Sequence, residues 1–278
     1  MQVIDYLDAY SSLCDKRNTF VVSSIKRDLE HAIDGGNLPD TFDLSGNTTE
    51  LRYTRVNDDY LDILLTPMRG IDFLRKLNLS YNNIGDQGAT NLAHFLKDDK
   101  YLVWINLRAN EIKSQGGVAL AKALQINLTL TELDIGDNGI GDFAGLEFAG
   151  TLQQVNTAIH RLHIDGCDLR ATSFISLFTV LQNNNTCSFL NISNNLCHSA
   201  SLTQTVQNDI MIHMSKMLRL NHTISRLGLK KFGITDWAMV DTFANTIMNN
   251  STLVILDLCR WVSYSSAYGI QQSTAKDR

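Results

Sequence analysis

Histidine, cysteine and glycine-rich stretches are the features of this chain that could bind a metal, attack a substrate or cradle a phosphate. The seven histidines are scattered, without the spacing of metal ligands. The stretch Gly136–Gly141 lacks the lysine of a phosphate-binding loop, and no GxSxG, HExxH or strand-associated GxGxxG motif occurs. Catalysis needs a nucleophile beside a base, or paired carboxylates in a cleft. The sequence therefore predicts no enzyme, no metal and no cofactor.

The five cysteines are Cys14, Cys167, Cys187, Cys197 and Cys259, and none forms a C-x-x-C pair. The last four fall at or beside structural positions of the repeat described below. This placement favours small, buried side chains over zinc ligands or disulfides. Their odd number fits a reducing compartment inside the cell.

Composition and charge narrow the partner class. The chain has 278 residues, of which 44% are hydrophobic and 19% charged, as in an ordinary folded protein. Its net charge of −5 comes from interleaved acids and bases, so we expect no nucleic-acid partner. No apolar run is long enough to span a membrane, and the first residues do not form a signal peptide. These observations predict an intracellular, cytoplasmic protein, with the nucleus or cilium as alternatives.

A unit of 28 residues recurs along the chain and must position any functional side chain. Its clearest copy is followed by two more in phase, as the residue numbers show: Leu74, Leu77, Leu79, Asn82, Ile84, Gly88, Leu92 and Leu96, then Leu102, Ile105, Leu107, Asn110, Ile112, Gly116, Leu120 and Leu124, then Leu130, Leu133, Ile135, Asn138, Ile140, Ala144, Phe148 and Leu152. A fixed period of this length predicts a solenoid of stacked units.

Each unit reads as a short strand followed by a helix. Alternation at Leu77 and Leu79 predicts a strand with one buried face, and the spacing of apolar residues over 88–96 predicts an amphipathic helix. The asparagine that follows each strand, at 82, 110, 138 and 195, can bond the backbone of the sharp turn. Stacked copies would form a ladder of amides.

This pattern resembles the leucine-rich repeats of the ribonuclease-inhibitor type, over Phe42 to Leu258. The resemblance implies an α/β horseshoe with a parallel sheet on the concave side and helices on the convex side. We count about seven repeats and a partial eighth. Cys167 and Phe232 replace the turn asparagine in two degenerate copies.

Two repeats are longer than the rest. The first carries an insertion over Thr48 to Val56 before a helix near Asp58 to Met68. A later one has nine extra residues within Ser201 to Leu220, which we interpret as a longer helix and its approach loop. Insertions in solenoids map to loops and can carry function, although length variation alone is also tolerated.

The domain organisation follows from the repeats. Residues 1–40 form an N-terminal cap, with helical spacing over Tyr6 to Cys14 and Phe20 to Ile33. Residues 41–260 form the repeat domain, and 261–278 an irregular tail without a closing helix. Trp261, Tyr264 and Tyr268 either cover the end of the array as a lid, or the last strand is an exposed edge through which the protein assembles with another chain.

The 28-residue phase predicts which side chains the inner sheet displays, in three columns that we expect to face solvent: Lys76, Trp104, Glu132, Arg161, Phe189, Arg226 and Ile255; Asn78, Asn106, Asp134, His163, Asn191, Gly228 and Asp257; Ser80, Arg108, Gly136, Asp165, Ser193, Lys230 and Cys259. Exposed aromatics beside arginines dominate the energetics of interfaces. We therefore expect a partner-binding surface made of Lys76, Tyr81, Trp104, Arg108, Glu132, Asp134, Asp137, Arg161, His163, Asp165, Phe189, Arg226 and Lys230, acidic in the middle and basic at the C-terminal end.

The sequence thus predicts a non-enzymatic scaffold that binds a protein on its concave face, with Trp104, Arg108, Arg161 and Phe189 as anchors. The resemblance implies two alternatives. One is a structural component of a large assembly such as a ciliary axoneme. The other is an activator of a small GTPase, for which Arg52 and Arg55 are the candidate residues.

Overall fold

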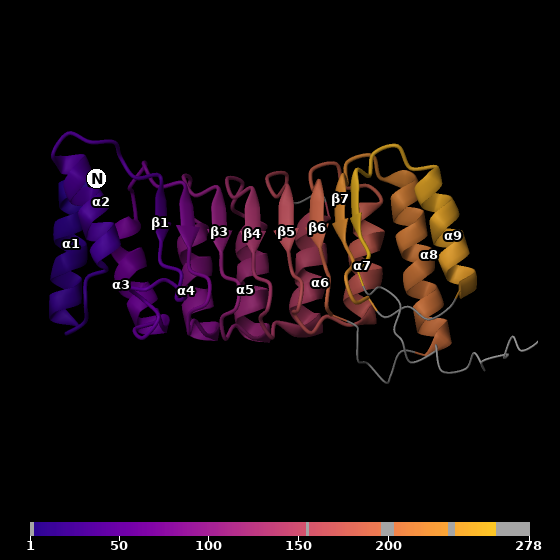
Figure 1. The fold of residues 1–278 in the computed structure, drawn as a ribbon, viewed down its shortest axis with the longest axis horizontal. Helices are drawn as coiled ribbons and strands as arrows, with labels where there is room; N and C mark the ends of the chain where they lie inside the picture. Colours follow the sequence, from indigo (N-terminus) through magenta and orange to yellow (C-terminus); the bar gives the residue numbers. More distant parts are fainter. Residues whose placement is uncertain (1–2, 154–155, 196–202, 233–236, 260–278) are drawn as a thin grey trace, which may run out of the picture.

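The computed structural model describes residues 3–153, 156–195, 203–232 and 237–259 (Figure 1). Two helices, α1 (Val3–Lys16) and α2 (Ser23–Ile33), come first, and strands then alternate with helices along the chain. The strands are β1 (Thr41–Asp43), β2 (Lys76–Asn78), β3 (Trp104–Asn106), β4 (Glu132–Asp134), β5 (Arg161–His163), β6 (Phe189–Asn191), β7 (Arg226–Gly228) and β8 (Ile255–Asp257). The helices between them are α3 (Asp58–Met68), α4 (Asp86–Leu96), α5 (Ser114–Leu124), α6 (Gly141–Leu152), α7 (Ala171–Leu181), α8 (Gln204–Leu220) and α9 (Trp237–Met248).

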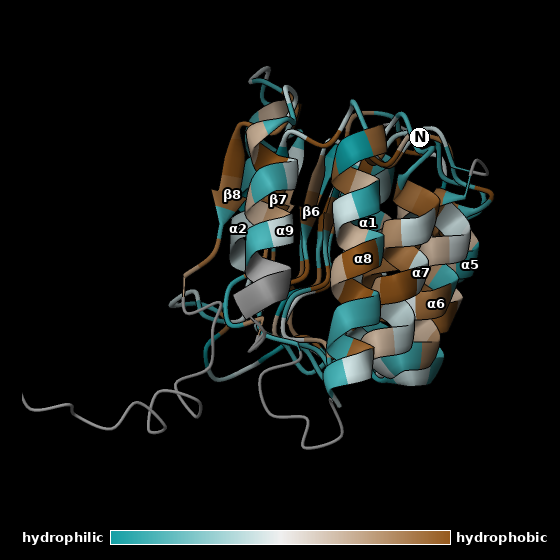
Figure 2. Cartoon of the chain, turned by 90° about the vertical axis from the view of Figure 1, so that its right-hand side faces the viewer, coloured by the Kyte–Doolittle hydropathy of each residue, from teal (hydrophilic) through white to brown (hydrophobic). Residues whose placement is uncertain are grey.

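The eight described strands form one open parallel sheet in chain order, with helices α3 to α8 on one of its faces (Figures 1 and 2). The other face, turned away from the helices, is called the concave face below. The pairing register joins Lys76 to Trp104 and Trp104 to Glu132, and it continues in the same way to Ile255. Each predicted column is therefore a row of neighbours, and the predicted α/β repeat solenoid is confirmed.

The core lies between the sheet and the helices. The middle residue of a strand points into it, and Leu77, Ile105 and Leu133 are fully buried. Helix residues such as Leu92 and Leu120 meet them from the other side. Because the strands are only three residues long, one unit cannot bury its own apolar face, and stacking supplies the remaining cover.

The predicted asparagine ladder is present and connects successive turns. The side-chain N–H of Asn110 donates to the carbonyls of Leu79 at 2.9 Å and Leu107 at 2.8 Å, and its Oδ1 accepts the N–H of Ile84. Where Cys167 takes the slot, its Sγ donates to the carbonyl of Ile135, so the link to the preceding turn persists. Each amide thus satisfies buried backbone groups that would otherwise lack partners.

Phe232, which occupies the same slot in a later repeat, follows a different principle. It is fully buried and packs edge-to-face on Phe174, with ring centroids 5.1 Å apart. At this position the aromatic side chain packs in the core, and ring contact takes the place of the hydrogen bonds that an asparagine amide would make.

Aspartates at the starts of helices cap the next helix rather than their own. The Oδ1 of Asp86 in α4 accepts the N–H groups of Lys113 and Gly116 at the start of α5, at 2.9 and 2.7 Å. Asp142 serves α7 in the same way by accepting from Arg170. These bonds fill the role of an N-cap side chain, which the residues preceding α5 and α7 do not supply. The sequence does not reveal this cap, because the two partners are about one repeat apart.

The N-terminal helices pack against the first repeat. The ring of Tyr6 on α1 lies 5.7 Å from that of Phe42 on β1. The hydroxyls of Tyr10 and Tyr60 bond each other, and Tyr60 donates to the carbonyl of Phe20. Both predicted helices are therefore present and cover the first repeat, while the domain limits at residues 40 and 260 stay predictions. Trp261, Tyr264 and Tyr268 lie outside the described residues.

Some sequence-based expectations need correction. Ser80 and Ser193 were expected to face solvent but are 3% and 6% exposed, because neighbouring polar groups on the sheet crowd them. Gly136 and Gly228, also in the predicted columns, are buried as well. Cys167 and Cys187 are buried free thiols as predicted, and Cys14 is buried too. Cys259 was expected to be buried but is exposed, and Cys197 lies outside the described residues. The long insertion does hold a longer helix, the 17-residue α8. No helix of the described ranges is long and apolar enough to cross a membrane.

Candidate interaction face

The concave face carries all thirteen predicted site residues, at strand positions or in the turns that follow. Five are exposed: Lys76, Tyr81, Asp137, Arg226 and Lys230. The other eight are partly buried: Trp104, Arg108, Glu132, Asp134, Arg161, His163, Asp165 and Phe189. The structure groups most of them into two clusters at the centre and one hollow at the C-terminal end.

The first cluster is a clamp, in which Arg108 bonds three carboxylates. Its Nε lies 3.1 Å from Asp134, one terminal nitrogen lies 2.6 Å from Asp165, and the other bonds Asp137. Burial lowers the pKa of Arg108, but the hydrogen bond to Asp165 and the nearby charges raise it more, so the net shift is upward. The guanidinium is therefore permanently charged and holds the turns after β3, β4 and β5 together.

Glycine makes this reach possible. Arg108 must pass over the turn after β4 to meet Asp165, and Gly136 lies directly beneath it. A Cβ at Gly136 would stand 2.3 Å from a terminal nitrogen of Arg108. Any larger residue at position 136 would displace the guanidinium, which gives a reason for glycine in a column that otherwise holds polar side chains.

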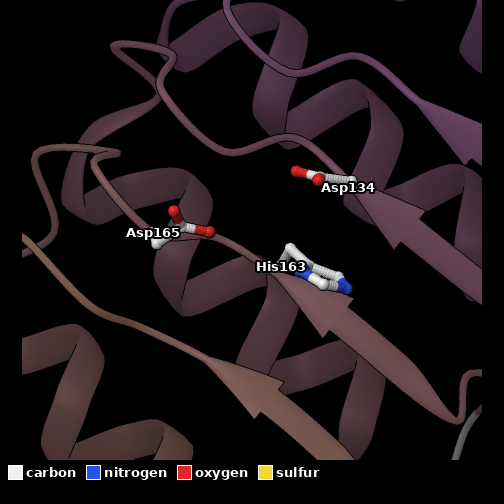
Figure 3. Close-up of side chains that lie close together, drawn as sticks. All are labelled: Asp134, His163 and Asp165. Atoms are coloured by element: carbon white, nitrogen blue, oxygen red, sulfur yellow. The ribbon is translucent and has the colours of Figure 1, made fainter. Parts of the chain in front are cut away.

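Asp134, His163 and Asp165 gather near the carboxyl ends of β4 and β5 (Figure 3). One potential ligand atom from each lies within 4.8 Å of the others, a geometry that could hold a divalent cation. Arg108, however, bonds both aspartates and supplies the positive charge. The arrangement therefore acts as an internal ion-pair network, and the prediction of no metal site stands as a prediction.

The second cluster surrounds Phe189. The guanidinium of Arg161 lies over its ring, 5.0 Å from the centroid, and the ring of His163 lies 4.6 Å away. Glu132 holds both neighbours: its carboxylate is 3.0 Å from Arg161 Nε and 3.3 Å from His163 Nε2. Neither contact meets hydrogen-bond alignment, so the Arg161 contact is an ion pair and the His163 contact a close approach of polar atoms. The result is a partly exposed aromatic ring fixed by three side chains.

Trp104 sits beside this cluster, on β3 next to Glu132 of β4. It is partly buried and shares its column with Lys76 on β2. Tyr81, in the turn after β2, is 41% exposed with a positive φ of 59°. The N-terminal half of the face therefore presents two aromatic side chains beside one lysine.

The C-terminal half is basic, as predicted. Lys230 pairs with Asp257 at 2.9 Å, and the hydrogen bond between them raises the pKa of Lys230 and lowers that of Asp257. Arg226 projects from β7 and is exposed. This half therefore differs in charge from the acidic centre.

The exposed arginines of the first-repeat insertion lie away from these clusters in the sequence. Arg52 stacks on its neighbour Tyr53, 5.2 Å from the ring centroid, and Tyr53 is 85% exposed. Arg55 is also exposed.

Part of the chain matches a known protein-family model. The model of the leucine-rich repeat matches residues 73–93 and 127–148, each of which contains one strand and much of the following helix. Together with the stacked strand–helix units, this identifies the repeat. The chain contains leucine-rich repeats. No curated protein matches this leucine-rich-repeat protein.

Two similar solved structures are low in identity. One is titled "Leiomodin-1 Actin-Binding Site 2 (ABS2)", at 19% identity and a TM-score of 0.46, covering 59% of this leucine-rich-repeat protein and 88% of that chain. The other is the tropomodulin C-terminal domain of Caenorhabditis elegans, at 10% identity and a TM-score of 0.42, covering 69% and 92%. At these scores neither supports an argument about what this protein binds.

The 28-residue phase places the predicted site residues on one face of the sheet, but it does not show how their charges combine. Arg108 and Asp165 are 57 residues apart, and each looked like an independent surface charge. The signal that could have revealed the clamp is Gly136, which leaves room between them in the same column.

Proposed function

We propose that this protein is a non-enzymatic scaffold that binds a protein partner on its concave face. The observation that carries the proposal is the fixed aromatic cluster of Phe189 with Arg161, His163 and Glu132, next to Trp104. Aromatic and arginine side chains supply most of the affinity at protein interfaces when they are held in place. The cluster is already ordered without a partner, so less side-chain freedom is lost on binding.

Arg108 has a different role in this proposal. Three carboxylates occupy its guanidinium, and its side chain is 20% exposed. We propose that it fixes the relative positions of three repeats, and that Trp104, Arg161 and Phe189 contact the partner. Recognition is then rigid-surface docking, with the acidic centre and the basic end choosing the partner's orientation.

Affinity capture from cell extract tests the proposal. The double variant Trp104→Ala/Arg161→Ala should lose a small set of proteins that the wild type retains. Phe143→Ala is the matched control, since Phe143 is 76% exposed on the helical side, at the start of α6. If the double variant captures the same proteins as the wild type, the concave face is not the binding surface.

A component of a large assembly is the second candidate, favoured by the C-terminal end of the described array. Met248 and Val254 are 83% and 79% exposed there, and Ile255 on β8 is 45% exposed. Large exposed apolar side chains on and near an edge strand are typical of a contact with another chain. Loss of binding in Val254→Asp, with retention in Trp104→Ala/Arg161→Ala, would favour this candidate.

An intracellular location is also part of the proposal. Cys14, Cys167 and Cys187 are buried as free thiols, which suits a reducing compartment. Burial raises the pKa of Cys187 to about 12, so its thiol stays protonated and unreactive.

A further inference from the structure

A hollow of about 320 Å³ opens on the concave face over β6, β7 and β8. Phe189, Arg226 and Ile255 form one side, in a single column of adjacent strands. Lys230 and Asp257 contribute to the lining. Small-molecule sites run from about 300 to 1,000 Å³, so the hollow is sized for a few side chains rather than for a large ligand.

The hollow exists because one column lacks a side chain. In the column that carries His163 and Asn191, the next strand has Gly228. A Cβ at Gly228 would stand 2.3 Å from Oδ1 of Asn191, which leans over the vacant position. The backbone of β7 therefore forms part of the floor.

The charges around the hollow are unequally satisfied. Asp165 bonds Arg108 and Asp257 bonds Lys230, so both lining carboxylates have cations. Arg226 has no ion pair or side-chain hydrogen bond within the described part of the chain. It stands on β7 between two apolar neighbours in its column, Phe189 on β6 and Ile255 on β8.

Resting on the proposed protein-binding function, we propose that this hollow receives an acidic peptide segment of the partner. A glutamate or aspartate side chain pairs with Arg226, and an apolar side chain close to it in sequence covers Phe189 and Ile255. The guanidinium fork suits a carboxylate, which it can bind through two N–H groups. Neighbouring strands are about 4.8 Å apart, so both contacts lie within the reach of three successive residues of an extended peptide.

The occupant follows from the charge and the shape together. A basic peptide would meet Arg226 and Lys230 and be repelled. A polar peptide without an apolar residue would leave the exposed part of Ile255 uncovered, at 45% of its surface. An acid beside an apolar residue satisfies both sides of the hollow at once.

Selection from a phage-displayed random peptide library on the immobilised protein tests the proposal. The expected consensus has an acidic residue within two positions of an apolar one. Fluorescence anisotropy with a labelled consensus peptide should then give a Kd about tenfold weaker for Arg226→Gln, the loss of one charge-assisted pair. Replacing the peptide acid by glutamine should weaken binding to the wild type equally, and should change little in Arg226→Gln.

Two further variants complete the test. Gly228→Leu should abolish binding by filling the hollow, with circular dichroism confirming the fold. Arg219→Gln is the matched control, since Arg219 is an exposed arginine in the last turn of α8, on the helical side, and it should bind normally.

A consensus without an acidic residue, or no enriched peptide at all, would overturn the inference. So would a Kd unchanged by Arg226→Gln. If the peptide is lost by Trp104→Ala/Arg161→Ala but kept by Arg226→Gln, the concave face still binds protein and only the assignment to the hollow fails. The concave-face proposal itself fails if Trp104→Ala/Arg161→Ala captures the same proteins from cell extract as the wild type.

Discussion

Replacing Arg108 by methionine should destabilise the protein far more than loss of an ordinary surface charge. Methionine keeps most of the side-chain length and removes the guanidinium. Asp134 and Asp165 have side chains only 14% exposed, and both would lose their cation. A carboxylate that is mostly buried and unpaired is costly because neither water nor a partner compensates its charge.

The size of the effect can be worked from the geometry. Potential ligand atoms of Asp134 and Asp165 lie within 4.8 Å of each other. Two unit charges at that separation repel by roughly 3 to 4 kcal/mol at an effective dielectric constant of about 20, and by about 1 kcal/mol in water. Since the clamp is partly exposed, we expect the free energy of unfolding to fall by about 2 to 4 kcal/mol.

Urea unfolding followed by circular dichroism measures this change. Adding Asp134→Asn and Asp165→Asn to Arg108→Met removes the repulsion and should recover at least half of the loss. Gly136→Ala should resemble Arg108→Met because its Cβ displaces the guanidinium. A loss of less than about 1 kcal/mol in Arg108→Met would refute the view that the clamp holds three repeats together.

Zinc provides an independent check on the same cluster. In Arg108→Met, the two aspartates and His163 are left without the guanidinium and can coordinate a cation. We expect Zn²⁺ to raise the melting temperature of this variant and not of the wild type. Equal stabilisation of both proteins would show that Arg108 does not occupy the position of a metal.

The remaining predictions concern the cap and the repeat turns. Burial raises the pKa of Tyr10 to about 12, so its contribution of about 3 kcal/mol is complete below pH 10 and lost as the pH rises through 12. The part of the tyrosinate absorbance that Tyr10→Phe removes should therefore appear together with unfolding. Tyr60→Phe should lower the free energy of unfolding by about 1 to 2 kcal/mol because it removes a buried hydrogen bond. Tyr6→Phe should change it little, since the Tyr6 hydroxyl has no hydrogen-bond partner in the described ranges. Ala109→Gly should stabilise the protein by up to about 1 kcal/mol, because φ at this residue is 55°; a lower melting temperature would contradict this. Asp86→Ala should cost about 1 to 2 kcal/mol by removing the acceptor for two N–H groups of α5, and thermal unfolding of Asp86→Ser, which keeps a hydroxyl acceptor, serves as the comparison.

The fold was predictable because the same pattern of apolar residues occurs in several copies along the chain. One copy of the pattern around Leu77 is ambiguous, but three copies in phase fix the strand, the turn and the helix together. The same phase gave the cross-strand neighbours, and the pairing of Lys76 with Trp104 follows it residue by residue. Register is strongly specified here because a shift by one residue would bring Leu77 to the wet face and a polar neighbour into the core.

The interactions between repeats were less predictable, for a physical reason. Asp86 looks like an acid that favours its own helix dipole, and nothing local shows that it bonds Lys113 in the next unit. Arg108 likewise reads as an exposed anchor until its side-chain reach across two strands is known. Periodicity gives the backbone frame, but the choice among partners depends on side-chain length and on which neighbours leave space.

Space left by glycine links the two features of the face that matter most. Gly136 lets Arg108 lie across a turn and bond three carboxylates, which takes that cation away from any partner. Gly228 has the opposite consequence, since the missing side chain opens the hollow beside Arg226, whose guanidinium is left without an internal acid in the described chain. An arginine next to a glycine in this sheet can therefore either link neighbouring repeats or bind a partner. It links the repeats when their carboxylates lie within its reach.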